Sequence, residues 1–570
     1  MKQNVKKFFS CFFILFAVLC LFTACDEKDD STQGESVELP PSDFVIQTMG
    51  SGECAVVGLS PTATISDTME IPSEYNGLLV TEIRRESETS WDGINKLIVP
   101  EGVTIIRDHT FADSTISEIV LPDSLLEIGH SAFSFCRNLK QITIPNGVTE
   151  IEEQTFAYCP YLERIKLPDG ITKISTSAFL ECVRLLEINI PSSVTDIETH
   201  AFLNCMSLEE ITLPSNIKEI KKYTFDNCRS LKSIAIPEGV TRIGEAAFRS
   251  CKDLKDVSIS ESVTEIGPYA FQYSGTGLEI FEKEHKLIIP KGVTKIGVEA
   301  FQDTGFTDIT ILGNIENWSF GSESLSEGEL LSMHGAFADN SMLKSVTVSG
   351  NCKRIGDYAF QNCGNLTKIT LEEGVTIIGN RAFFAGGDWK ISDLILPPTL
   401  TIPKSVTEIG NEAFVGTSFN KVIILGNVTD WGESAFGGCM ELEIVEISGA
   451  CKTIGRSAFA GGDLKKVTLG EGVTHIENFA FGHCYGLEVI LPESIEWIDS
   501  HAFSGASKVY LPAGFVSSNF ADDAFQEPTV IYYKGSEWEL KGLMGGSDLQ
   551  FCTCYYYSDM TKKYVLYEDD

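Results

Sequence analysis

The sequence predicts a repeat solenoid, in which short parallel strands stack coil upon coil along one axis. Three observations point to this fold. A phenylalanine, usually preceded by alanine, recurs along most of the chain, the intervals between these residues are nearly constant, and an Ile-x-Ile-Pro-like segment keeps its distance from each of them. A unit of about 23 residues cannot bury its own apolar side, whereas stacked units can, because each supplies one layer of a continuous core.

The recurring phenylalanine defines the repeat. Of its 17 successive intervals, nine are 23 residues and five are 22. The three longer intervals, of 30, 36 and 31 residues, indicate insertions near 272–300, 302–336 and 384–413. The phenylalanine occupies 18 positions: Phe111, Phe133, Phe156, Phe179, Phe202, Phe225, Phe248, Phe271, Phe301, Phe337, Phe360, Phe383, Phe414, Phe436, Phe459, Phe481, Phe503 and Phe525.

One unit shows what each segment of a coil should form. Ile142 and Ile144 alternate with polar residues, which is typical of a short strand with one buried face. Pro145 ends that strand because proline has no amide hydrogen to donate. The Val-x-x-Ile segment that follows predicts a second short extended stretch. The Ala-Phe-x-x-Cys segment at 132–136 has helical spacing, and we expect a turn or two of 3₁₀ or α-helix there.

These segments resemble the BspA-like class of leucine-rich repeats, whose units follow LxxIxIPxxVTxIGxxAFxxC. Residues 139–145 and 240–248 nearly reproduce that pattern. The resemblance implies a leucine-rich-repeat-like, right-handed stack over about 18 coils, from residue 95 to residue 528. Residues 44–94 look like the N-terminal capping region of that family and 529–570 like its C-terminal capping unit. Both caps are needed because an open stack exposes core and unpaired strand edges.

The beginning of the chain predicts export. Residues 1–24 combine lysines with an uncharged apolar run too short to span a bilayer, which indicates a signal peptide. The run ends at Cys25 in a segment that resembles a bacterial lipobox, and this resemblance implies that Cys25 is diacylated. Residues 25–43 would form a lipidated flexible tether. The predicted protein is exported and lipid-anchored at the cell surface, in the outer membrane of a Gram-negative cell; the alternative is an ordinary signal peptide containing a cysteine.

Composition excludes several functional classes. The chain carries 80 acidic residues against 44 Lys plus Arg, a formal net charge of −36, which excludes a nucleic-acid binder that works by neutralising phosphates. The hydrophobic fraction of 43% is enough for a packed core and excludes a wholly disordered chain.

Most cysteines follow the repeat. Nine of the 17 lie three residues after the phenylalanine, a phase that predicts one small apolar thiol per coil inside the core. Disulfides are the alternative, since an exported protein permits them, but parallel side chains in register point the same way rather than toward each other. The nine are Cys136, Cys159, Cys182, Cys205, Cys228, Cys251, Cys363, Cys439 and Cys484.

The sequence predicts no enzyme. It contains no HExxH, P-loop, nucleophile elbow or EF-hand loop, and its cysteines and histidines lack metal-site spacing. Its glutamates recur in repeat phase, as expected for a solvated face. We therefore expect no catalytic residues, no cofactor and no metal.

Two surfaces are candidates for binding. The first is the strand face, through outward residues such as Lys166 and Asn189; the second is the insertions, which bring Trp318, Phe320 and Trp389 into or beside loops. Exposed strand residues and neutral drift in loop length are the respective non-functional explanations. Insertions in solenoids often carry variable function, which favours 302–336 as the recognition element.

The resemblance implies adhesion or recognition of host or neighbour-cell macromolecules. The expected partner is an extracellular protein, such as a matrix protein, or a glycan, with a lipid anchor into the membrane and no nucleic acid. The alternative is an accessory lipoprotein that captures glycan or peptide beside nutrient-uptake machinery. Aromatic side chains lining one groove would favour a glycan, and a flat polar strip favours a protein.

Overall fold

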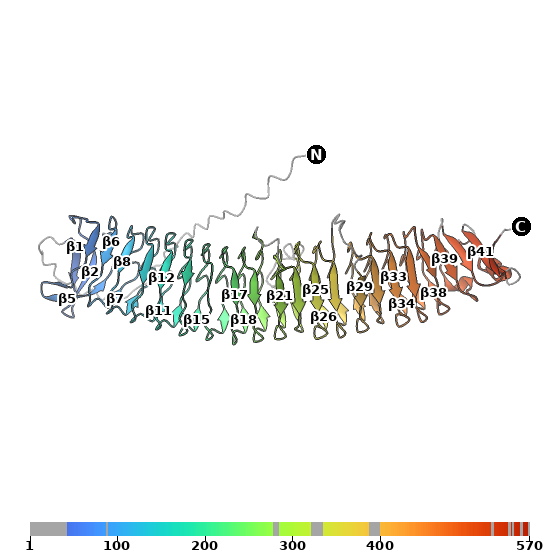
Figure 1. Ribbon diagram of the computed structural model, residues 1–570, viewed down its shortest axis with the longest axis horizontal. Coiled ribbons are helices and arrows are strands. Elements are labelled where there is room, and N and C mark those ends of the chain that lie inside the picture. The colour runs from blue at the N-terminus through green and yellow to red at the C-terminus, as the bar shows by residue number, and fades with distance from the viewer. Residues whose placement is uncertain are drawn as a thin grey trace, which may run out of the picture.

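The computed structural model describes residues 43–86, 89–277, 284–320, 334–386, 399–525, 529–544, 549, 552–558 and 562–567. These residues form an elongated stack of coils that runs from the N-terminal to the C-terminal end of the rod (Figure 1). A regular coil contributes two short strands, and strands of equal phase pair in parallel from coil to coil. The predicted repeat solenoid is confirmed.

The first strand row contains the Ile-x-Ile-like segment of each coil, which in many coils is followed by a proline such as Pro145 or Pro168. Its central residues are buried and their neighbours are exposed, as in the pattern exposed–buried–exposed of Gln141–Thr143. The strands of this row are β3 (Thr68–Glu70), β6 (Lys96–Ile98), β8 (Glu118–Val120), β10 (Gln141–Thr143), β12 (Arg164–Lys166), β14 (Glu187–Ile188), β17 (Ser233–Ala235), β19 (Asp256–Ser258), β21 (Lys286–Ile289), β23 (Asp308–Ile311), β25 (Ser345–Val348), β27 (Lys368–Leu371), β29 (Thr399–Ile402), β31 (Lys421–Ile424), β33 (Ile444–Ile447), β35 (Lys466–Leu469), β37 (Glu488–Ile490), β39 (Lys508–Leu511), β40 (Val530–Tyr533), β41 (Thr553–Ser558) and β42 (Lys563–Leu566).

The second strand row contains the Val-x-x-Ile segment and confirms the second extended stretch. Most of its strands have only two residues, of which the second is buried. They are β2 (Cys54–Leu59), β5 (Leu78–Ile83), β7 (Ile105–Ile106), β9 (Glu127–Ile128), β11 (Glu150–Ile151), β13 (Lys173–Ile174), β15 (Asp196–Ile197), β16 (Glu219–Ile220), β18 (Arg242–Ile243), β20 (Glu265–Ile266), β22 (Lys295–Gly297), β24 (Asn317–Phe320), β26 (Arg354–Ile355), β28 (Ile377–Ile378), β30 (Glu408–Ile409), β32 (Asp430–Trp431), β34 (Thr453–Ile454), β36 (His475–Ile476) and β38 (Trp497–Ile498).

The repeating phenylalanines form one continuous stack. All 17 consecutive pairs, from Phe111 to Phe525, lie with ring centroids 4.8 to 5.7 Å apart. The longest insertion does not interrupt it, because Phe301 and Phe337 are 4.9 Å apart with an interplanar angle of 3°. The inserted residues therefore leave the coil outline, and the core continues unchanged beneath them.

The Ala-Phe-x-x-Cys segment corrects the expected brief helices, because it forms hydrogen-bonded turns. Around Phe133, residues Ser131 and Phe135 have φ of 52° and 58°, so left-handed residues interrupt any helix on both sides. The Phe133 amide donates to the Thr155 carbonyl of the next coil, at 2.9 Å. The segment thus combines turn bonds within its own coil, such as that from the Cys136 amide to the Phe133 carbonyl at 3.2 Å, with bonds that join it to the next coil. In the described part of the chain, helix is confined to η3 (Ser517–Asn519), α2 (Glu537–Met544) and a 3₁₀ conformation at Leu549.

Both ends of the stack are closed by antiparallel structure. At the N-terminal end β1 (Phe44–Thr48) pairs antiparallel with β2, and β4 (Glu74–Tyr75) pairs antiparallel with β5. At the C-terminal end β41 and β42 form an antiparallel pair, and α2 buries Leu540 and Leu543. These elements cover core and strand edges that an open stack would expose.

The cysteine column is a ladder of thiols. All 14 cysteines in the described part of the chain are buried, and the nine of the ladder are free thiols. Cys159 Sγ donates to the Phe133 carbonyl of the preceding coil at 3.1 Å, and Cys182 makes the same bond to Phe156. Ser274 occupies this position in another coil, where its Oγ donates to the Phe248 carbonyl at 2.6 Å. The column therefore favours a small hydrogen-bond donor.

Candidate functional site

The first strand row carries a groove over its N-terminal coils. The groove has a volume of about 950 Å³ and is lined by residues from 118 to 212, which span β8, β10, β12, β14 and the following coil. Its position follows from strand alternation: isoleucines at the strand centres point into the core, so the residues on either side point out. The groove is thus built from side chains that the core does not require.

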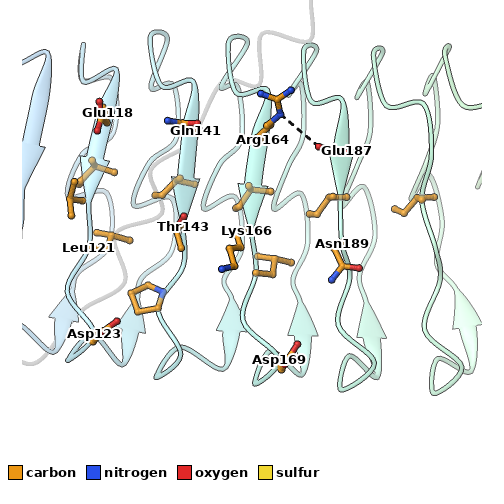
Figure 2. A pocket seen from close by; sticks show the side chains of 18 of the residues that line it. Glu118, Leu121, Asp123, Gln141, Thr143, Arg164, Lys166, Asp169, Glu187 and Asn189 are labelled. Carbon is orange, nitrogen blue, oxygen red and sulfur yellow. Dashed lines mark ion pairs between the residues drawn. The ribbon is translucent and has the colours of Figure 1, made fainter.

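Two columns of outward side chains cross the groove (Figure 2). We call the residues before the buried isoleucine the outer column and the residues after it the inner column. The outer column is almost entirely charged, whereas the inner column is mostly polar and uncharged. The outer column is Glu118, Gln141, Arg164, Glu187 and Glu210, and the inner column is Val120, Thr143, Lys166, Asn189 and Thr212.

In the outer column Glu118 pairs closely with Lys96, at 2.6 Å, whereas Arg164 and Glu187 are exposed and only loosely paired. Arg164 Nε lies 3.7 Å from Glu187 Oε1, with the two side chains 64% and 74% exposed (Figure 2). Such solvated pairs contribute about 0–1 kcal/mol to folding, so the ion pair leaves both groups available to a ligand. Asp123 and Asp169 add negative charge at one edge of the groove.

Lys166 and Asn189, predicted as binding residues, lie in adjacent coils of the inner column. Both are exposed and both line the groove. Lys166 pairs in register with Thr143 and makes no ion pair with any described residue. Its ammonium group is therefore available to a carboxylate or hydroxyl group of a ligand. The acidic residues of the lining were not identified from the sequence. The repeat contains the signal for them, because each outer-column residue lies two positions before an inner-column residue.

Trp318, predicted in or beside a loop as a candidate binding residue, is instead a buried strand residue. Its side chain is only 5% exposed, and its Nε1 donates to the Arg354 carbonyl at 2.9 Å. Asn317 of β24 pairs with Lys295 of β22. Trp318, the residue after Asn317, therefore corresponds to Ile296, the residue after Lys295. Trp318 thus occupies the buried position of the second strand row.

The other predicted positions are not described in full. Phe320 ends β24, and its backbone pairs with Gly297. Trp389 and Cys25 lie outside the described residues, as do 278–283, 321–333 and 387–398 within the three insertions. The role expected for the 302–336 insertion therefore stays a prediction.

A polar network joins the base of that insertion to the turns. Gln302 Nε2 donates to Asp339 Oδ2 at 2.7 Å, and Gln272 Nε2 donates to Glu299 Oε2 at 2.9 Å. His334 lies 3.8 Å from Glu299 and 3.6 Å from Asp339, and the pKa of its imidazole is raised, chiefly by its hydrogen bond to Glu299. These contacts tie the two ends of the insertion to neighbouring coils.

The described residues offer neither a metal site nor a membrane span. They contain no group of three or more His, Cys, Asp or Glu side chains arranged to hold a metal ion. In the same residues, no helix has the length and apolar character needed to cross a membrane. The thiols do not form a reactive group, because burial raises the pKa of Cys182 and of Cys363 to about 12.

A family profile described as a BspA type leucine-rich repeat region matches the chain. The matches cover residues 81–209, 172–286, 196–326, 280–390 and 397–510. Among curated proteins, no sequence matches.

Several solved structures of bacterial leucine-rich repeat proteins are similar to the chain. One is a leucine-rich repeat protein from Bacteroides ovatus, with 21% identity, 87% of this chain and 100% of that chain covered, and a TM-score of 0.46. A second is a leucine-rich cell surface protein from Faecalibacterium prausnitzii, with 20% identity, 78% and 95% covered, and a TM-score of 0.25. A third is the leucine-rich repeat protein of T. pallidum, with 24% identity, 39% and 82% covered, and a TM-score of 0.25.

Proposed function

This chain belongs to the BspA-type leucine-rich repeat family, and we propose that it is a non-catalytic recognition protein of the bacterial surface. Its ligand is another protein, which binds in the groove on the first strand row. Leucine-rich repeat proteins of bacteria are generally protein-interaction modules, and BspA-like members are typically surface proteins. Host or neighbour-cell proteins are the partners that such a position makes accessible.

The groove is the observation that carries the proposal. It combines a length of five coils with side chains of both charges and uncharged hydrogen-bonding groups such as Thr143 and Asn189. Aromatic residues are absent from its lining. A polypeptide segment offers carboxylates, ammonium groups and amides in a line, so it can satisfy such a surface along its whole length. The polar strip thus favours a protein ligand, as the sequence analysis anticipated.

Charge directs the encounter. The chain carries a formal net charge of −36, and acidic residues outnumber basic ones in the groove lining. A partner with a basic surface will therefore be attracted over distances comparable to the Debye length, about 10 Å at 0.1 M salt. The ammonium group of Lys166, in the middle of the groove, would then form an ion pair with an acidic group of the same partner and fix the partner's position along the groove.

Lipidation would place the groove outside the cell. Diacylation of Cys25 supplies two acyl chains, which hold a protein stably to a membrane. The following acidic segment, which begins with Asp26 and Glu27, resembles the surface-export signal of Bacteroidota lipoproteins. A tether of about 19 residues between the anchor and residue 44 then lets the rod reach a partner away from the membrane surface.

A charge reversal with a matched control tests the proposal. The purified full chain is screened against a panel of matrix and cell-surface proteins by biolayer interferometry. Lys166→Glu should weaken binding of any protein captured by the groove about tenfold or more. The partner's carboxylate, which pairs with the Lys166 ammonium group, would be repelled by the new glutamate. Ser258→Glu makes an acidic change in the same inner column, four coils farther on and outside the groove lining.

The two variants separate the groove from general charge effects. Binding that falls for Lys166→Glu and persists for Ser258→Glu supports the groove. Because Lys166→Glu changes the net charge by −2 and Ser258→Glu by −1, a loss of binding free energy for Ser258→Glu about half that for Lys166→Glu would show that net charge alone controls binding. A protein whose binding ignores both variants is bound elsewhere, which would contradict the proposal.

A further inference from the structure

A ladder of tyrosines occupies the C-terminal end of the first strand row, near β39 and β41 in Figure 1. The register of β37, β39, β40 and β41 places Ile490, Tyr510, Tyr532 and Tyr555 in one column. Ring centroids are 4.7 Å apart for the first tyrosine pair and 5.0 Å for the second, with interplanar angles of 14° and 13°. This is the inner column of the same strand row, changed from polar to aromatic.

Among the residues that the structure describes, no aromatic side chain stacks on the face of Tyr510 that is turned away from Tyr532. Tyr532 has a tyrosine on each side, and Tyr564 of β42 packs edge-on against Tyr510 and Tyr532 at 6.2 and 5.3 Å. Tyr510 is the first ring of the stack, so its second face is directed toward the coil of Ile490. The side chain of Ile490 is 69% exposed, which leaves an apolar step beside that face open to solvent.

A groove of about 720 Å³ lies in front of Tyr510. Its lining joins the ring and Ile490 to polar residues of the two preceding coils, namely Lys465, Lys466, Thr468, Glu471 and Glu488. The size falls within the range of about 300–1,000 Å³ that is usual for small-ligand sites. The groove therefore offers one aromatic face, an aliphatic floor and a polar rim.

The groove lining carries two lysines, Lys465 and Lys466, and two glutamates, Glu471 and Glu488, so its charges balance, and Lys465 and Glu488 are held in ion pairs. Lys508 Nζ lies 2.5 Å from Glu488 Oε1, Lys534 Nζ lies 2.8 Å from Glu493 Oε1, and Lys465 pairs with Glu443. A charged ligand would therefore gain no net attraction from the lining. An uncharged ligand with hydroxyl groups could instead accept from the ammonium groups and donate to the carboxylates while the pairs stay formed.

We propose that this groove binds a neutral oligosaccharide, with one pyranose ring lying against the free face of Tyr510 above Ile490. A pyranose presents an apolar C–H face to an aromatic ring and hydroxyl groups around its edge, so it matches the ring and the rim together. An apolar protein side chain would use the ring and Ile490 but would leave the donors and acceptors of the rim to water. The rim is what favours the sugar.

This site is distinct from the N-terminal groove, whose lining lacks aromatic residues. In a solenoid, each coil contacts only its neighbours, so the two grooves are independent in structure. A failure of protein binding at Lys166 would leave the proposal at Tyr510 untouched, and the reverse also holds.

Substitutions at Tyr510 test the proposal. The purified full chain is screened on an array of neutral four- to six-unit oligosaccharides of glucose, xylose, mannose and N-acetylglucosamine, and positive sugars are titrated by calorimetry. Tyr510→Thr removes the ring. Threonine is chosen because the same column already contains a threonine at Thr468, two coils earlier. Tyr510→Phe keeps the ring. Tyr485→Thr is the matched control, since Tyr485 is 67% exposed in a neighbouring coil and does not line the groove.

We expect at least one neutral oligosaccharide to bind, with affinity reduced about tenfold or more by Tyr510→Thr and changed less than about threefold by Tyr510→Phe. Tyr485→Thr and Lys166→Glu should leave it unchanged. Raising the salt concentration should also have little effect, because no net charge is neutralised. An unchanged melting temperature confirms that each variant is folded.

Three results would overturn the proposal. The first is the absence of binding by every neutral oligosaccharide at millimolar concentration. The second is sugar binding that survives Tyr510→Thr in the folded variant. The third is a protein or peptide that loses binding in Tyr510→Thr while no sugar binds at all, which would identify the groove as an apolar docking site instead.

Discussion

Replacing Phe202 by alanine tests whether the phenylalanine stack holds neighbouring coils together. The side chain is fully buried, and its ring lies 5.3 Å from Phe179 and 5.4 Å from Phe225, with interplanar angles of 8° and 4°. The change removes both ring contacts and leaves a cavity that the hydrogen-bonded coils on either side cannot close. A buried Phe→Ala change costs about 3–5 kcal/mol. Two aromatic contacts at about 0.5–1.5 kcal/mol each account for a part of that cost.

Hydrogen exchange is the appropriate assay, because a long stack need not unfold in one step. The Phe202 amide donates to the Thr224 carbonyl at 2.9 Å, and the Phe179 amide donates to the Ala201 carbonyl at 2.8 Å, so both report on the altered interface. With a factor of ten for each 1.4 kcal/mol, protection of these amides should fall by about two to four powers of ten. Amides near Phe459 should keep their protection.

The matched control is Phe135→Ala. Phe135 is 38% exposed and stacks on Tyr158 alone, at 4.4 Å, outside the core column. Its loss should cost about 1 kcal/mol or less. The reasoning is refuted if Phe202→Ala lowers protection no more than Phe135→Ala does. It is also refuted if protection falls equally along the whole chain, since the coils would then not behave as units coupled only to their neighbours.

Three further predictions concern cysteines. In the native protein at pH 8, iodoacetamide should label few of the nine ladder thiols, while unfolding in guanidinium without reductant should expose them all; disulfide-linked peptides between neighbouring ladder positions would contradict this. Burial raises the pKa of Cys182 from 9.0 to about 12, so the contribution of its neutral thiol to stability is complete below pH 9 and is lost as the pH rises toward 12. The urea midpoint of the wild type should therefore fall over that pH window. It should fall less in Cys182→Ser, which lacks this titrating group. Cys25→Ser should abolish incorporation of an alkyne-labelled fatty acid; label that persists in this variant would refute lipidation at Cys25.

The buried columns were predictable from the sequence because one geometric rule governs them. Each coil must place an aromatic ring, a small donor and three or four aliphatic side chains at fixed positions, and the sequence repeats these at a constant phase. The turn at Ala-Phe-x-x-Cys was not predictable in the same way. Its apolar spacing is helical, but its conformation is set by hydrogen bonds to the next coil, such as that from the Phe133 amide to Thr155. Single-unit reasoning contains no information about that partner.

Trp318 shows how an insertion can hide a repeat position. The segment Gly313-Asn314-Ile315-Glu316-Asn317-Trp318 closely matches Gly426-Asn427-Val428-Thr429-Asp430-Trp431. Trp431 pairs with Ile409, so this tryptophan too takes the place of the second-row isoleucine. Comparing the two segments would have identified Trp318 as a core residue, whereas counting from the phenylalanine placed it in a loop. The signal was present in the sequence, but the phase of the second strand row was needed to see it.

The outward columns of the first strand row are where this fold can vary its function at little cost to stability. The inner column changes from Lys166 and Asn189 to Tyr510 and Tyr532, yet the strands keep the alternation of buried and outward residues and the parallel register. Because coils couple only to their neighbours, a polar groove at one end and an aromatic groove at the other can coexist without mutual adjustment. A partner that presents both protein and glycan can then engage both grooves at once. The second contact forms at the effective concentration set by the rod, so a glycoprotein should bind more tightly than either component alone.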